Sequence, residues 1–171
     1  MSLTVTADTP ATASQFNSLI PYFAQQSSDQ TLNTTTFTDH VTFTAITVGA
    51  GETWEYTINL VIGDSTVASG LRTRLEVTGT VTTGYRHILG MGATATTAND
   101  ATNFDGQARN TTTTVTHGVT ASASVYATVQ EKFLVIGGAS GGTFGLEWSC
   151  AAMSGNVTVK AGGHIIGHRV V

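Results

Sequence analysis

The sequence predicts an all-β protein, an antiparallel β-sandwich that is jelly-roll-like and carries a short N-terminal helical anchor. Apolar residues recur at every second position over 52–62, the period of a strand with one buried face. Charged residues are only 11% of the chain, under half of the usual share of about 25%. Threonine, which suits a pleated surface, supplies much of the polar content, whereas good helix formers are scarce.

Length and charge limit the classes of protein to consider. The 171 residues fit one β-sandwich domain over 31–171, preceded by an anchor or linker over 1–30. The net charge of -4, without a basic patch, argues against nucleic acid as a partner. The single Cys150 excludes an internal disulfide, and no apolar run is long enough to insert into a membrane. We therefore expect a chain kept in the cytosol, with no cofactor.

The first thirty residues differ from the rest. Thr9 and Pro10 suit the N-cap and the first turn of a helix, and Pro21 shortens or kinks it. An apolar stripe follows at helical spacing, formed by Phe16, Leu19, Ile20 and Phe23. Two interpretations remain open: a tether that docks onto a partner through this stripe, or a cap on an open end of the sandwich.

The alternating stretch 52–62 organises the expected sheet. A turn-rich run follows at 63–66, and apolar residues alternate again over 71–77. Two such runs joined by a short polar loop predict an antiparallel hairpin.

The remaining strands are expected on either side of this hairpin. A strand is expected at 32–37, and the change of apolar phase after Ala45 indicates a bulge or bend. Residues 90–110 have no clear period and predict a long exposed loop or a subunit contact. Charges interrupt one strand at Glu131 and Lys132. Further strands are expected at 85–89, 125–136, 144–150 and 164–171.

Three patterns resemble catalytic or metal-binding sites. The run 138–142 matches the G-x-S-x-G nucleophile elbow, which requires a strand that leads into a helix, but the flanking pattern favours a hairpin turn. His164 and His168 are four residues apart, which on a strand is about 13 Å, too far for one ion. A loose oxygen-rich cluster is formed by Asn99, Asp100, Asn103 and Asp105. Its spacing does not fit that of a calcium-binding loop.

The carboxylates and tryptophans have ordinary interpretations. Arg72 and Arg74 can form cross-strand pairs with the carboxylates of the alternating strands, Glu52, Glu55, Glu76 and Glu147. The alternative, a glycosidase pair, needs a separation that the sequence does not fix. Trp54 and Trp148 are expected in the core rather than on a sugar-stacking surface. We expect no enzymatic activity.

Four segments together resemble a β domain of tailed-phage virion proteins, the minor tail, fibre and head-appendage type of actinobacterial phages. These are LNTTTFTD (32–39), VGAGETWEYTINL (48–60), GTFGLEWS (142–149) and VTVKAGGHIIGHRV (157–170). The lead-in PATASQFNSL (10–19) is similar to the linker before such domains. The chain departs from the family pattern at 149–154, where SCAAMS replaces a polar loop, and in its short length.

The resemblance implies a non-enzymatic virion structural protein on the particle surface, assembled in the host cytoplasm as a homotrimer. Its expected partners are copies of itself and the major capsid or tail protein, bound through Phe16, Leu19, Ile20 and Phe23. The short chain favours a capsid decoration or head-fibre protein. The alternatives are a tail fibre or receptor-binding protein, and a carbohydrate-binding module that recognises a host surface glycan or protein.

Overall fold

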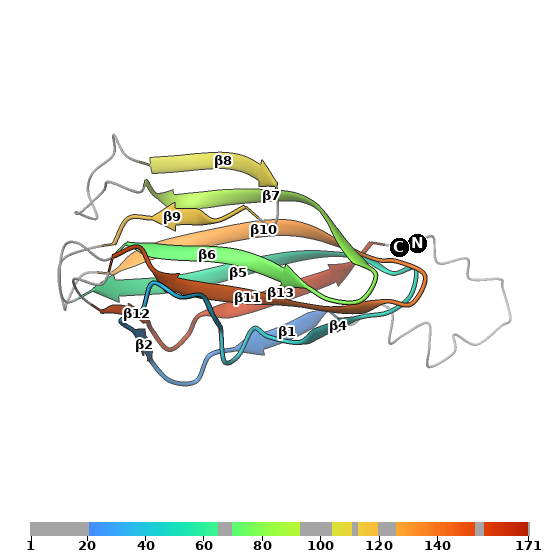
Figure 1. Cartoon of the computed structure of the whole chain (residues 1–171), viewed down its shortest axis with the longest axis horizontal. Coiled ribbons are helices and arrows are strands. Elements are labelled where there is room, and N and C mark those ends of the chain that lie inside the picture. Colours follow the sequence, from blue (N-terminus) through green and yellow to red (C-terminus); the bar gives the residue numbers. More distant parts are fainter. Residues whose placement is uncertain are drawn as a thin grey trace, which may run out of the picture.

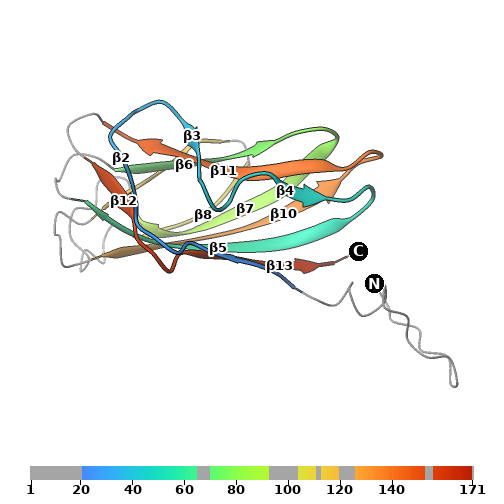
Figure 2. The ribbon, with the colours of Figure 1, turned by 90° about the horizontal axis from the view of Figure 1, so that it is seen from below.

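The fold is all-β and consists of two packed antiparallel sheets. We describe it from a computed structural model, which places residues 21–64, 70–92, 104–110, 113–119, 126–152 and 156–170. No helix occurs among these residues. The anchor helix, with Phe16, Leu19 and Ile20, lies outside the described residues. Figure 2 shows the two layers edge-on.

The larger sheet has eight strands and the smaller has five. Along the larger sheet the order is β1 (Tyr22–Gln25), β13 (His164–Arg169), β5 (Thr53–Asp64), β10 (Ala127–Gly137), β7 (Val81–Met91) and β8 (Phe104–Asn110). β12 (Val157–Val159) pairs with β5 and with β2 (Gln30–Leu32). The smaller sheet follows the order β3 (Thr38–Asp39), β11 (Gly142–Cys150), β6 (Leu71–Val77) and β9 (Val115–His117), and β4 (Ile46–Val48) pairs with β11 (Figure 1).

The predicted hairpin between 52–62 and 71–77 is wrong, although both strands exist. β5 pairs with β13 and β10 in the larger sheet, whereas β6 pairs with β11 and β9 in the smaller one. The apolar phases of both strands point into the space between the sheets, so the chain crosses between the layers where a hairpin was expected. Strands distant in sequence occupy both edges of β5.

Four other expectations also change. The larger sheet already includes residues 22–25 and Gln30, which the sequence assigned to the anchor. The strand expected at 32–37 is instead β2, which ends at Leu32. Phe23, expected on a helical stripe, lies on β1. The expected loop at 90–110 contains the end of β7 and all of β8. The bend after Ala45 is confirmed, since Ala45 has a positive φ of 51° just before β4.

The core fills the space between the sheets with the alternating residues of β5, β10 and β11. An aromatic cluster joins the layers, with ring centroids 4.5 Å apart for Tyr56 and Phe144 and 5.6 Å apart for Phe133 and Phe144. Gly167 on β13 makes room for this cluster, because a Cβ there would lie 2.2 Å from the Tyr56 ring. Trp148 is buried as predicted, and Trp54 is partly buried against the core.

Three turns, at 49–51, 78–80 and 137–142, interlock through backbone hydrogen bonds at one end of the sandwich. The turn 137–142 donates from Gly137 N to Glu52 O at 2.7 Å and from Gly138 N to Thr80 O at 3.0 Å. A Cβ on Gly141 would lie 2.4 Å from Val48 O, and its φ is 66°. The predicted G-x-S-x-G motif therefore lies in a turn between two strands, β10 and β11, and its glycines allow the close approach of neighbouring backbones.

Candidate functional site

A buried polar network crosses the space between the two sheets. Arg86 on β7 and Glu131 on β10 come from the larger sheet, and Thr73 on β6 and His117 on β9 come from the smaller one. The side chains of Arg86 and Glu131 are both fully buried. We call these four residues the inter-sheet network.

Arg86 is the main counter-ion of the network. Its Nε donates to Glu131 Oε2 at 2.9 Å, and a second guanidinium nitrogen lies 2.7 Å from the same oxygen. The guanidinium also donates to Thr73 Oγ1 at 2.7 Å and to Thr113 O at 2.9 Å. Through Thr113, Arg86 holds the backbone just before β9, where the chain has passed from one sheet to the other.

The hydrogen bonds assign the protonated nitrogen of His117. Thr73 Oγ1 donates its proton to Glu131 Oε1 at 2.6 Å, and the carboxylate can only accept. His117 Nε2 lies 3.0 Å from Thr73 Oγ1 and 3.2 Å from Glu131 Oε1. Both contacts are satisfied only if Nε2 carries the proton and donates.

The network keeps Glu131 ionised. Burial alone raises the pKa of the Glu131 carboxyl, but the Arg86 charge and the contacts with His117 and Thr73 outweigh burial and lower that pKa to about 2. With both charged side chains inaccessible, the network cannot receive a substrate from solvent. What it can do is fix the two sheets relative to each other.

A second buried polar chain lies near β3 and β11. Thr42 N donates to His40 Nδ1 at 3.3 Å, so Nε2 carries the proton and donates to Gln26 Oε1 at 3.1 Å. The ring stacks on Phe43 with centroids 4.3 Å apart, and burial lowers the pKa of His40 to about 4. Sequence reasoning assigned no role to His40 or Gln26.

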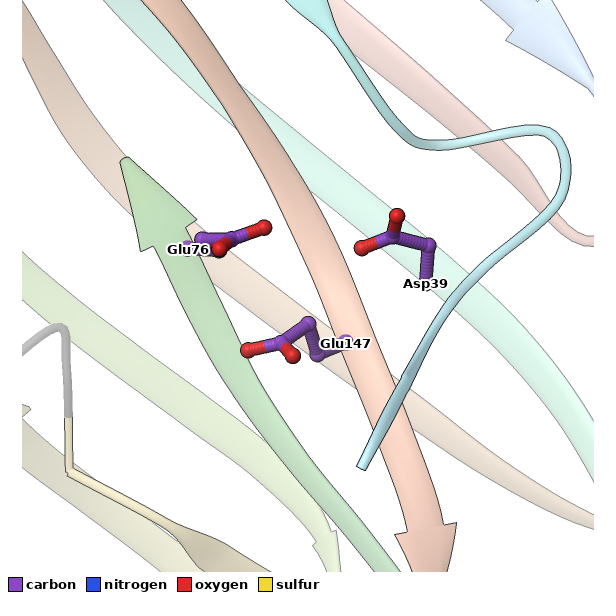
Figure 3. A group of neighbouring side chains, drawn as sticks. All are labelled: Asp39, Glu76 and Glu147. Carbon is purple, nitrogen blue, oxygen red and sulfur yellow. The ribbon is translucent and has the colours of Figure 1, made fainter. Parts of the chain in front are cut away.

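The outer face of the smaller sheet carries a group of carboxylates. Asp39, Glu76 and Glu147 come from β3, β6 and β11, and their oxygens lie within 4.8 Å of one another (Figure 3). Arg74 already neutralises Glu147, with a second nitrogen 3.0 Å from Oε1, and its guanidinium lies 4.4 Å from the centre of the Phe37 ring. The cross-strand pairing expected for Arg74 is thus present, and the group contains its own cation.

The other predicted site residues are dispersed. Glu52 accepts from Trp54 Nε1 at 3.0 Å and pairs with Arg169, and Glu55 pairs with Lys132 at 2.9 Å. Arg72 donates to Ser149 at 3.1 Å rather than to a carboxylate. On β13, His164 contacts Asn59 at 3.2 Å, and His168 is exposed. Of the oxygen-rich cluster, Asp100, Asn99 and Asn103 lie outside the described residues.

The two ends of the sandwich differ. The chain enters at Tyr22, which pairs with Gly167 at the end that holds the interlocked turns. At the opposite end lie the strand ends joined by four connections: β5 to β6, β7 to β8, β9 to β10, and β11 to β12. Among the described residues, no helix has the length and apolar character needed to cross a membrane.

Comparisons with known proteins assign no family. No family model and no curated protein matches the chain. One solved structure, that of infectious bursal disease virus Gx strain, aligns with 88% of this chain at 12% sequence identity and a TM-score of 0.23. The chain spans 40% of the length of that viral chain.

Proposed function

We propose that the chain is a non-enzymatic virion structural protein of a tailed bacteriophage. It is a homotrimeric surface appendage or decoration protein, attached to the capsid or tail through its N-terminal segment. The observation that carries the proposal is the entry of the chain at Tyr22, at the end of the sandwich opposite the four connections. A tether at that end leaves the other end directed away from the particle.

Two further features support the proposal. The segments that resemble phage virion proteins form central strands: 48–60 includes most of β5, and 142–149 is nearly all of β11. The repeated crossing between sheets, from β5 to β6 to β7 and from β9 to β10 to β11, suits the jelly-roll-like connectivity that belongs to this proposal.

The native mass and the location on the particle test the proposal. One chain is 17.7 kDa, so light scattering of a homotrimer should give three times 17.7 kDa, or 53.1 kDa. Immunogold labelling should mark virions of the phage that encodes the chain. The double substitution Leu19→Asp and Ile20→Asp should abolish binding to particles, whereas Val5→Asp, outside the apolar stripe, should not. Unlabelled virions would refute the proposal.

A second candidate function is recognition of a host surface by a receptor-binding or carbohydrate-binding protein. Four pairs of consecutive strands end or begin at the end remote from Tyr22, which favours this candidate because binding residues concentrate on loops held by a rigid scaffold. Binding of the intact chain to a glycan array would support this candidate, and labelled virions without any glycan binding would favour the decoration role.

A further inference from the structure

The outer face of the larger sheet is exposed and unusually apolar. We call it the open face. Most of the large apolar side chains that are exposed among the described residues lie on it: Phe23, Tyr85, Leu89, Tyr126 and Ile136, with exposed fractions of 59%, 38%, 46%, 43% and 36%. Half-buried Leu134 and Ile166 lie between them on the central strands. No other described strand covers this face (Figures 1 and 2).

The register places these side chains in continuous rows across the sheet. Phe23 on β1 pairs with Ile166 on β13, which pairs with Thr57 on β5. Thr57 pairs with Lys132 on β10, and Lys132 with His87 on β7. The open face therefore presents one continuous surface from β1 to β7.

The two outer faces of the sandwich differ in charge. Near the centre of the open face, Glu55 and Lys132 neutralise each other at 2.9 Å, and Tyr85 donates to the same carboxylate at 2.8 Å. At the edge of this face, Asp29 and Lys160 form a second ion pair, and Lys160 lies over the Tyr126 ring. The outer face of the smaller sheet instead gathers Asp39, Arg72, Arg74, Glu76 and Glu147, and the segment containing Phe37 lies over it. Depletion of charge and enrichment of aromatic side chains are typical of the centre of a protein interface.

The open face is large enough for a stable contact. The six strands β1, β13, β5, β10, β7 and β8 contain 51 residues, which at about 3.3 Å per residue and about 4.8 Å between strands give a face of roughly 800 Å². Stable interfaces bury about 800 Å² on each partner. Because the two ion pairs of the face, Glu55–Lys132 and Asp29–Lys160, are each neutral, two copies can meet there without like-charge repulsion. Exposed amides, such as Gln130 bonded to Asn59 at 2.9 Å, offer hydrogen-bonding groups to a copy.

We propose that the open face is the surface through which copies of this chain contact one another. The inference rests on the self-association included in the proposed function and adds the location of the contact. In a three-fold assembly, the three open faces would point toward the axis. The smaller sheet and its charged surface would then face outward.

The test combines a substitution with a matched control. Leu89→Glu places a charge at a 46% exposed position on the open face, and Val41→Glu places the same charge at a 76% exposed position outside it. We expect Leu89→Glu to weaken association about 100-fold or more and to reduce the measured mass from 53.1 kDa toward 17.7 kDa. Val41→Glu should keep the mass of the wild type.

Footprinting of the wild type supplies a second measurement that does not depend on a variant. Tyr85 is 38% exposed on the open face, whereas the half-buried Phe37 lies beside Arg72 and Arg74 on the outer face of the smaller sheet. Hydroxyl-radical labelling of the assembled protein should spare Tyr85 and modify Phe37. An assembled wild type with Tyr85 fully labelled, or a Leu89→Glu variant with unchanged mass, would overturn the location of the contact. A wild type that is monomeric at every concentration would instead overturn the self-association of the proposed function.

Discussion

Replacement of Arg86 with methionine tests the inter-sheet network most directly. Methionine is also long and flexible, but it removes the charge that offsets the buried Glu131 carboxylate. Removal of one partner of a buried ion pair costs about 3–5 kcal/mol because the other charge remains buried. A domain is stable by about 5–15 kcal/mol in total. We therefore expect the Arg86→Met variant to lose a large share of its free energy of unfolding at neutral pH.

The pH dependence of that loss is the more specific signature. In the wild type the pKa of Glu131 is about 2, below its usual 4.5, so its contribution is present above pH 4.5 and is lost as the pH falls toward 2. Without Arg86, burial raises the pKa of Glu131 above its value in the unfolded chain. Proton uptake by Glu131 then stabilises the folded variant in acid, so its stability falls as pH rises.

The assay is urea unfolding at one fixed protein concentration, at about pH 5 and about pH 8. The difference between wild type and Arg86→Met should grow toward the higher pH. The double variant Arg86→Met with Glu131→Leu should recover part of the loss, because it removes both charges of the pair. Asp29→Asn, which disrupts an exposed pair with Lys160, is the control and should change stability far less. A change below about 1 kcal/mol for Arg86→Met at both pH values would refute the role of the network.

Three further predictions concern single positions. Burial lowers the pKa of His40 to about 4 in the folded protein, so the unfolded chain takes up the proton first as the pH falls from 6.5. The wild type should therefore lose about 3 kcal/mol of its free energy of unfolding between pH 6.5 and about 4. His40→Gln should abolish this loss, which urea unfolding across that pH range measures. Gly141 and Gly51 both have a positive φ (66° and 70°), but of the two only a Cβ at Gly141 would meet backbone, 2.4 Å from Val48 O. Gly141→Ala should therefore lower the free energy of unfolding, measured in urea, by at least about 2 kcal/mol more than Gly51→Ala does. Arg74→Gln leaves the Asp39, Glu76 and Glu147 carboxylates without the Arg74 cation. Millimolar Ca²⁺ should therefore raise the melting temperature of this variant. An equal rise in the wild type would contradict the role of Arg74.

The strands of the core could be predicted because alternation is a local signal. Tyr56, Ile58, Leu60 and Ile62 are all buried, as their period of two predicts. The pairing of those strands was not predictable in the same way. β5 and β6 are neighbours in sequence and both alternate, yet they lie in different sheets, because the partners of β5 are β10 and β13 from much later in the chain. Alternation assigns a buried face to each strand but leaves open the sheet to which the strand belongs.

The position of Phe23 illustrates the limit of periodic patterns in a short segment. Its spacing from Phe16, Leu19 and Ile20 fits a helix, but Tyr22 and Ala24 pack toward the core while Phe23 and Gln25 point outward, the period of a strand. Pairing with β13 from the other end of the chain decides between the two. A helical stripe that ends in the first strand can therefore contain at most Phe16, Leu19 and Ile20.

Part of the inter-sheet network could be inferred from the sequence. Glu131 shares its phase on β10 with the buried Val129 and Phe133, and Arg86 shares its phase on β7 with the buried Ile88. A charge on a buried phase requires a partner of opposite charge, because an isolated ion in the core is too costly. Arg72 and Arg74 lie on the opposite phase from the buried Leu71 and Leu75, so among these three arginines only Arg86 fits the role. The hydrogen bonds from Thr73 and His117 depend on the smaller sheet lying over these strands, and no local pattern in β6 or β9 indicates that arrangement.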